Sequence, residues 1–424
     1  MKIIFYLFLF FCYKYQYCNI ITFPFQRILS PNIDESNFYS HYAHNVIYTN
    51  LKIGTPITEI KAQIKTSQFS LCIRNDSIYD YNTSSTYFQN SEEFNPYNKD
   101  YTNAISSNET FNFGKESAKA ENIKFLLTKK SKFDLDGILG LKIYENNNKV
   151  YGHGLISQLK SKKIINNETF FFDFDKNNIN IGELVIGEYP HLIDKYKENY
   201  PYYQFKSAGL HIQTYDIKFE IKVISSYWYG KKFENDVKIE IDIESGYIIG
   251  SKYFEEAADK FFTPYFRNKK CRRDTVNVLY YAYICDDDID ISSFPEIKFY
   301  TGDADYNFTL TYEDVFVKKF GKTYFMIVFD TKGYNVFWTL GSTFIKRNSL
   351  VFDMNRRIVG FYDKNIKDKN NYTIYIIIIS LAGLIILALV AFIIYKFVWK
   401  KRPKFANELE DDFVYSPNEP KLGI

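Results

Sequence analysis

Two stretches decide the fold: Ile60-Lys61-Ala62-Gln63-Ile64-Lys65 and, much later, Val237-Lys238-Ile239-Glu240-Ile241-Asp242-Ile243-Glu244. In both, apolar residues alternate with polar ones at a period of two, which is typical of a half-buried β-strand. Each stretch runs into a short polar turn, so the body of the chain contains two loosely matching halves. Helices are predicted for only two parts of the body, residues 154–162 and 252–262. The pattern therefore predicts a mostly β body.

Composition agrees with a β body and excludes several functions. The 424 residues include 53 Lys+Arg and 50 Asp+Glu, a formal charge of +3, whereas nucleic-acid binding needs a basic face. Aromatic residues make up 19% of the chain, and they favour strands. The five histidines do not fall at zinc-ligand spacing with Cys or Glu, and no nucleophile elbow or phosphate loop is present. We expect no nucleic-acid partner, no metal and no cofactor.

Both ends of the chain carry membrane signals. Lys2 and a ten-residue apolar run predict a secretory signal peptide over residues 1–18. Residues 374–395 are uncharged and long enough to span about 30 Å of hydrocarbon as a transmembrane helix. Basic residues follow this span directly, so the positive-inside rule places residues 396–424 in the cytosol as a short tail. We expect a single-pass type I membrane protein with a lumenal or extracellular body.

The secretory route agrees with the glycosylation sequons and the cysteines. Six sites match the N-glycosylation pattern: Asn75, Asn82, Asn108, Asn167, Asn307 and Asn371. Three cysteines remain once the signal is removed. Cys271 and Cys285 bracket a short loop and are expected to pair in an oxidising compartment. Cys72 is then left as a small buried residue.

Six further stretches resemble, in the family's own order, segments of pepsin-like aspartic peptidases. They are Leu51-Lys52-Ile53-Gly54-Thr55-Pro56, Phe133-Asp134-Leu135-Asp136-Gly137-Ile138-Leu139-Gly140-Leu141, residues 155–159, 181–187 and 294–299, and a C-terminal segment made of residues 338–345 and 351–353. The resemblance implies an all-β, bilobal fold with a substrate cleft between the lobes. Residues 46–188 would form the N-terminal lobe and residues 189–362 the C-terminal lobe, after a short N-terminal segment, residues 19–45.

The resemblance also implies where the catalytic residues should lie. In this family each lobe supplies one Asp from an Asp-Thr-Gly or Asp-Ser-Gly turn, and the two carboxyl groups share one proton. Here Lys65 falls at the first Asp position and Ser67 at the Gly position. In the second half, an ungapped match places Asp242 at the Asp position, and a match to Ser245-Gly246 places Glu244 there. We prefer Asp242, because the ungapped match keeps the strand phase.

Either alignment leaves one acid facing one lysine, so we expect an ion pair of Lys65 with Asp242 or Glu244. An ammonium group cannot share a proton symmetrically with a carboxylate. The family's Tyr-Gly hairpin over the cleft is also absent between Tyr101 and Lys124, where only Phe113-Gly114 stands, which predicts a shortened flap. One hypothesis is a membrane-anchored, catalytically impaired peptidase-like protein, a pseudoprotease, that binds extended peptides. The alternative is an active aspartic endopeptidase of the secretory or endolysosomal pathway or the cell surface.

Overall fold

The structure is a computed structural model that describes residues 20–28, 34–43, 46–75, 78–93, 104–113, 119–128, 135–142, 154–175, 178, 180–211, 220–364, 366 and 370–400. The chain divides into two units, residues 1–364 and 365–424. The predicted signal peptide, the start of the Phe133-Asp134 stretch and the tail from residue 401 lie outside the described residues.

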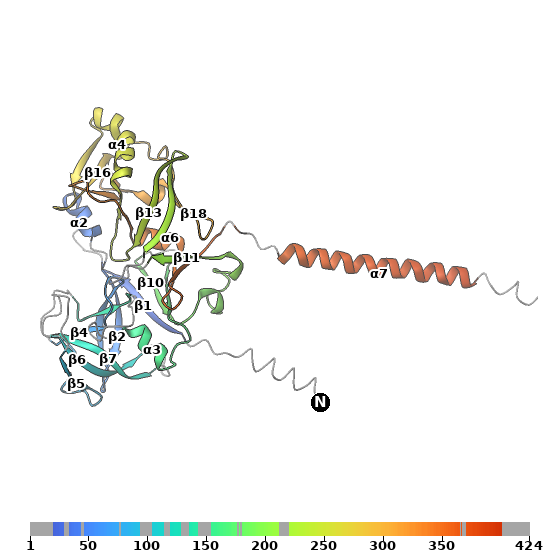
Figure 1. Ribbon diagram of the computed structural model, residues 1–424, viewed down its shortest axis with the longest axis horizontal. Helices are drawn as coiled ribbons and strands as arrows, with labels where there is room; N and C mark the ends of the chain where they lie inside the picture. Colours follow the sequence, from blue (N-terminus) through green and yellow to red (C-terminus); the bar gives the residue numbers. More distant parts are fainter. Residues whose placement is uncertain are drawn as a thin grey trace, which may run out of the picture. The chain divides into compact units, whose positions relative to one another are not determined.

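A six-stranded antiparallel sheet joins the two halves of the body (Figure 1). Three strands come from the first half of the chain and three from the second. Its strand order is β1 (Ile21–Arg27), β10 (Ile181–Ile186), β9 (Thr169–Phe174), β23 (Val351–Asp353), β24 (Ile358–Tyr362) and β11 (Phe205–His211). Phe170, Phe171 and Phe352 at its centre are buried, which agrees with the aromatic composition.

The first lobe is built from strands between β1 and β9, together with one helix. The elements are β2 (Ile47–Ile53), β3 (Thr58–Lys65), β4 (Cys72–Arg74), β5 (Phe88–Glu93), β6 (Ile105–Asn112), β7 (Lys119–Thr128), β8 (Gly137–Gly140) and α3 (Leu155–Ser161). A short insertion between β1 and β2 holds η1 (Glu35–Asn37) and α2 (Phe38–Ala43). The buried positions of β3 are Ile60, Ala62 and Ile64, which confirms the alternation predicted from the sequence.

The second lobe follows two short helical turns, η4 (Pro190–Leu192) and η5 (Tyr202–Gln204). Its elements are β12 (Glu220–Trp228), β13 (Lys231–Ile241), β14 (Ile248–Ile249), α4 (Lys252–Arg267), β15 (Cys271–Thr275), β16 (Tyr280–Asp286), β17 (Ile297–Thr301), β18 (Tyr306–Leu310), α5 (Tyr312–Val315), β19 (Phe316–Lys319), β20 (Lys322–Phe325), β21 (Ile327–Asp330), β22 (Trp338–Leu340) and α6 (Ser342–Asn348). Both helices predicted from the sequence are present as α3 and α4, and α4 extends to Arg267.

The two lobes repeat one arrangement of strands. In the first, β3 runs parallel to β8, and β4 returns antiparallel to β8 and parallel to β7. In the second, β13 runs parallel to β22, and β14 returns antiparallel to β22 and parallel to β21. The corresponding pairs of opposed residues are Ile64 and Leu139 with Ile241 and Leu340, and Cys72 and Ile138 with Ile249 and Thr339.

This internal repeat relates the two turns after β3 and β13 without a gap. The shift along the chain that brings Ile64 onto Ile241 also brings Cys72 onto Ile249. The same shift brings Lys65 onto Asp242 and Ser67 onto Glu244. The glycine that ends β8 and the glycine that follows β22 keep the correspondence. A Cβ on Gly140 would lie 2.6 Å from the Gln68 oxygen, and one on Gly341 would lie 2.5 Å from the Ser245 oxygen.

The second unit consists mainly of α7 (Asn370–Lys400). Within it, Ile379–Phe397 is long and apolar enough to cross a membrane. The helix contains the span predicted over residues 374–395 and continues beyond both of its ends. Asn371 lies in this helix, outside the region whose side chains are described.

Candidate functional site

The first turn begins where β3 ends. The carbonyl oxygen of Lys65 accepts a hydrogen bond of 2.8 Å from the Leu141 amide, directly after β8. Thr66 is buried and Ser67 is exposed. The alternation of β3 places Lys65 on the side opposite to Ile64, so its ammonium group is aimed away from the first-lobe core, and 22% of its side chain is exposed.

The second turn begins where β13 ends and is closed by its own carboxylate. The amide of Asp242 donates to the Leu340 oxygen at 3.0 Å. The Asp242 carboxylate accepts a hydrogen bond of 2.8 Å from the Glu244 amide, a local turn that Asp side chains make readily. Burial, followed by the charges of neighbouring groups that include Asp242, raises the pKa of Tyr247 to about 12. The Asp242 carboxylate is therefore held back against its own lobe.

Glu244 makes the contact between the two turns. One of its carboxylate oxygens accepts a hydrogen bond of 2.9 Å from the Ser67 amide. The other lies 3.6 Å from Lys65 Nζ, and the exposed fractions of the Lys65 and Glu244 side chains are 22% and 19%. The structure therefore brings Lys65 to Glu244, the less favoured of the two expected partners. Asp242 nevertheless holds the position that corresponds to Lys65 in the repeat.

The repeat gives a physical reason why Glu244, and not Asp242, contacts the first turn. The Ser67 amide in the first turn corresponds to the Glu244 amide in the second, which bonds to the side chain two residues before it. Lys65 has three donors and no acceptor, so it cannot receive the Ser67 amide in the same way. The longer side chain of Glu244 crosses between the turns and supplies the missing acceptor together with a counter-charge.

The backbone at Ser67 and Glu244 shows no strain. These two residues align with glycines in the family resemblance, so a conformation that only glycine adopts freely would carry a cost there. Neither residue is among the described non-glycine residues with positive φ. The glycines that the site does require are Gly140 and Gly341, because backbone atoms fill the space where a Cβ would be placed.

Phe113 does not lie over the two turns. It follows β6, whose Phe111 pairs with Ile53, at the opposite end of the β2–β3 pair from Lys65. Phe113 is buried, and its ring packs edge-on against Phe23 at 5.6 Å between centroids. Phe113 is thus at the far end of the lobe from Lys65, and the shortened flap stays a prediction. The other connection of this kind, between β5 and β6, lies mostly outside the described residues.

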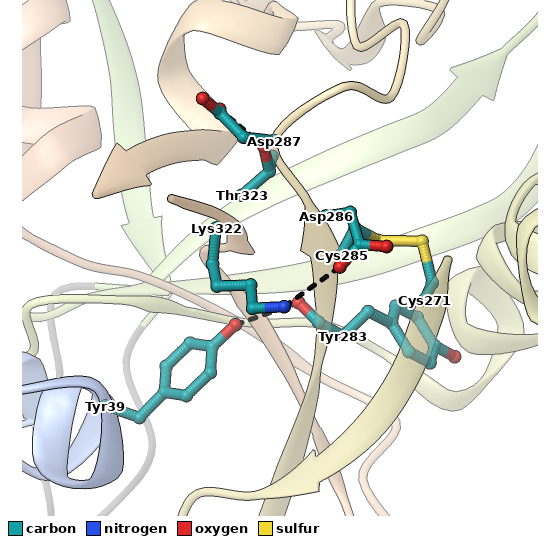
Figure 2. Close-up of a disulfide and its surroundings, with 8 residues drawn as sticks. All are labelled: Tyr39, Cys271, Tyr283, Cys285, Asp286, Asp287, Lys322 and Thr323. Carbon is teal, nitrogen blue, oxygen red and sulfur yellow. Dashed lines mark hydrogen bonds and ion pairs between the residues drawn. A yellow bond between two sulfur atoms is a disulfide. The ribbon is translucent and has the colours of Figure 1, made fainter. Parts of the chain in front are cut away.

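The disulfide predicted from cysteine spacing is present. Cys271 and Cys285 face each other across β15 and β16 and are bonded (Figure 2). Cys72 is buried and forms no disulfide with another described cysteine. The acidic run beside Cys285 is neutralised by lysines. Its ion pairs are Asp286 with Lys322, Asp287 with Lys318 and Asp288 with Lys270. Within the described part of the chain, no cluster of His, Cys, Asp and Glu could hold a metal ion.

The sequons differ in their surroundings. Asn82 and Asn307 are exposed, and Asn75 and Asn108 are partly exposed. The Asn167 side-chain amide donates to Glu188 at 2.8 Å, so attaching a glycan there would replace that hydrogen bond. A cavity of about 690 Å³ lies on the outer face of β1, β2 and β10 in the first lobe, and neither Lys65 nor Glu244 lines it.

Fold and site together define a bilobal, mostly β protein with one turn from each lobe meeting at the centre. A family model of the eukaryotic aspartyl protease matches residues 51–363. The chain belongs to this family. Among solved structures it is similar to the basic 7S globulin from soybean, with a TM-score of 0.57 and 14% sequence identity, over 81% of this chain and 96% of that one. At this identity the likeness shows the fold alone. No curated protein matches the chain.

Proposed function

We propose that this protein is a membrane-anchored member of the aspartyl protease family that binds extended peptides between its lobes without hydrolysing them. The observation that carries the proposal is the cross-lobe ion pair of Lys65 with Glu244. Peptide hydrolysis in this family needs two carboxyl groups that share one proton, one to activate water and one to polarise the carbonyl. An ammonium group at one of the two positions cannot take the part of the second carboxyl group, because it has donors and no acceptor.

Loss of hydrolysis does not remove the means of binding a peptide. Extended peptides are held mainly by main-chain hydrogen bonds to strands and loops, and pockets for alternate side chains add specificity. Both lobes contain the strands of the repeat, and each central turn packs against a glycine, Gly140 in the first lobe and Gly341 in the second. A peptide bound between the lobes would meet the Lys65 ammonium group and the Glu244 carboxylate, which already interact with each other.

The membrane anchor and its orientation belong to the same proposal. The Ile379–Phe397 segment has the length and composition of a span, and the basic residues after it favour a cytosolic tail. The Cys271–Cys285 disulfide agrees with a body on the lumenal or extracellular side, because disulfides persist in oxidising compartments. In this arrangement the cleft would open to secreted or membrane-bound partners.

Full-length protein in detergent micelles would be assayed for cleavage of a mixed peptide pool between pH 3 and 6. We expect no cleavage, and no difference between the wild type and Asp242→Asn. Binding would be followed by hydrogen exchange of the Ser67 and Glu244 turns with and without the same pool, with slower exchange expected when peptides are present. Pepstatin-sensitive cleavage that disappears in Asp242→Asn would overturn the proposal.

One observation favours the alternative, an active aspartic endopeptidase. The second turn holds two carboxylates, Asp242 and Glu244, and Glu244 lies at the junction of the lobes. If these two acted as the dyad, then Glu244→Gln and Asp242→Asn would each abolish cleavage. The same assay with both variants therefore separates the two functions.

A further inference from the structure

The segment between β1 and β2 leaves the first half of the molecule and docks on the second lobe. Both β1 and β2 belong to the first half and pair with each other at Phe25–Arg27. The insertion between them carries η1 and α2, and α2 lies beside β16 of the second lobe (Figure 1). Phe38 and Tyr39 of α2 are only 1% and 4% exposed. A surface segment would not bury two aromatic side chains in the other lobe by chance contact.

Tyr39 fills a gap in the hydrogen bonding of that lobe. Its hydroxyl lies 3.0 Å from the Tyr283 backbone oxygen (Figure 2). The same hydroxyl lies 2.9 Å from the Phe325 backbone oxygen. The β16–β20 ladder ends at Ile284 and Tyr324, one pair before these two residues, and β16 then continues against β21. Tyr39 thus donates to buried carbonyl oxygens at the point where β16 stops pairing with β20 and begins to pair with β21.

Further contacts hold the same helix in place. The Phe38 ring stacks on Tyr324 with 3.8 Å between centroids. Asp34 caps η1 through the amides of Ser36 and Asn37. Glu35 faces Arg272 at 3.8 Å, and Arg272 follows Cys271 of the disulfide on β15. The anchor therefore lies on a hairpin that is itself covalently closed.

The other end of the segment is equally fixed. Six residues of β1 pair with β10 in the bridging sheet, and Phe23 and Phe25 are buried beneath it. Removing β1 and α2 would take away the strand between β10 and β2 and uncover both anchoring sites.

We propose that β1 (Ile21–Arg27) and α2 (Phe38–Ala43) act together as a permanent strap that ties the second lobe to the first and limits how far the lobes separate around the Lys65–Glu244 contact. Removal of the predicted signal peptide after residue 18 would leave β1 whole. The strap does not depend on whether the protein cleaves peptides. The strap acts by lowering the frequency of lobe opening, which is measurable as hydrogen exchange of the Ser67 amide.

The first test removes only the Tyr39 hydroxyl. In full-length Tyr39→Phe, amide exchange near Tyr283, Phe325 and Ser67 should be faster by about fivefold, the effect of losing one buried hydrogen bond. Tyr300→Phe is the matched control, because the Tyr300 hydroxyl donates at 3.1 Å to Asp305 within the β17–β18 hairpin, outside the strap. Its exchange at these sites should equal that of the wild type. Faster exchange confined to residues 34–43 in Tyr39→Phe would overturn the proposal.

The second test cuts the strap in the folded protein. A specific protease site would be inserted after Ile28, and a control site in the exposed Tyr229-Gly230 turn between β12 and β13. We expect cutting after Ile28 to speed exchange at Ser67 and Glu244, while cutting the control turn changes neither. Equal behaviour of the two cut proteins would contradict the strap. So would a native N-terminus, found by sequencing the protein from its source, that begins after residue 43.

Discussion

The two turns at the centre of the molecule have the same backbone register and opposite chemistry. In the second-lobe turn, the Asp242 carboxylate accepts the Glu244 amide within its own lobe. In the first-lobe turn, Lys65 cannot accept the corresponding Ser67 amide, and the acceptor comes from the other lobe. In the second-lobe turn this hydrogen bond stays within one lobe, and in the first-lobe turn the corresponding bond crosses between the lobes. A lysine in one turn and an acid in the other thus go with a hydrogen bond placed between the lobes in one case and within a lobe in the other.

The difference teaches that two turns with the same backbone register can carry different side-chain chemistry. The features common to both turns are the short buried strands and the glycines behind them, and these are set by packing. The features that differ are side chains that point into the space between the lobes. Variants of the common features should therefore have large and similar effects, whereas variants of the side chains should differ between the turns.

The largest effect is expected from the shared glycines. A Cβ on Gly341 would lie 2.4 Å from the Tyr247 oxygen, and a Cβ on Gly140 would lie 2.6 Å from the Gln68 oxygen. Gly341→Ala and Gly140→Ala should each reduce the free energy of unfolding by about 3 kcal/mol, because backbone must shift to admit the methyl group. Denaturant unfolding of the full chain, followed by fluorescence, measures this loss.

Gly209→Ala in β11 is the control for these two variants. No atom of the described residues lies within 4 Å of the place that the added methyl group would take, and the φ of Gly209 is not positive. The free energy of unfolding should therefore change by less than about 0.5 kcal/mol. If Gly140→Ala were tolerated while Gly341→Ala was not, the equivalence of the two turns would be wrong.

The next largest loss of stability is expected from Lys65→Asp, which gives both turns a carboxylate. Lys65→Asp removes the partner of Glu244 and places a second carboxylate near it, which should cost about 2 kcal/mol at pH 7. Repelling carboxylates have raised pKa values in the folded state, so the folded protein takes up protons more readily. Stability should therefore recover as the pH falls below about 5. Unfolding midpoints of the variant and wild type at pH 7 and pH 4 provide the measurement.

A cost at pH 7 that persisted unchanged at pH 4 would show that the loss is steric and not electrostatic. Lys65→Met is the matched control, since it removes the ammonium group without adding a carboxylate. Its deficit should be smaller than that of Lys65→Asp at pH 7 and nearly independent of pH over this range.

The strands that lead into the two turns could be predicted from the sequence, whereas the side-chain contacts between the lobes could not. The alternation over residues 60–65 and 237–244 predicts the two strands because burial on one face imposes a period of two. The ungapped shift predicts that Asp242 corresponds to Lys65, and the register of the strands before the two turns agrees with that shift. It could not show that Glu244 reaches Lys65, because that depends on side-chain length and on the distance between two lobes. Tyr39 was missed for a similar reason: its hydroxyl partners are backbone oxygens more than 240 positions away.

A smaller effect on stability is expected from His191, a titrating residue outside the two turns. Burial lowers the pKa of His191 from 6.5 to about 4, and the ring lies 2.7 Å from the Tyr362 hydroxyl. Between pH 6.5 and pH 4 the unfolded chain gains a proton on His191 and the folded chain does not, so stability falls as the pH is lowered. Because the ring is only half-buried, we expect a loss of about 1 kcal/mol. In His191→Phe, unfolding midpoints should fall less over this range, and an unchanged slope would contradict the assignment.

The central claim, an ion pair between Lys65 and Glu244, is tested most directly by a double-mutant cycle on unfolding free energy at pH 7. Lys65→Met and Glu244→Gln should show a coupling of about 0.5–1 kcal/mol, as expected for a partly exposed pair. A parallel cycle of Lys65→Met with Asp242→Asn should give a smaller coupling, because the Asp242 carboxylate serves its own turn. Additive effects of Lys65→Met and Glu244→Gln, with the coupling found at Asp242 instead, would contradict the account.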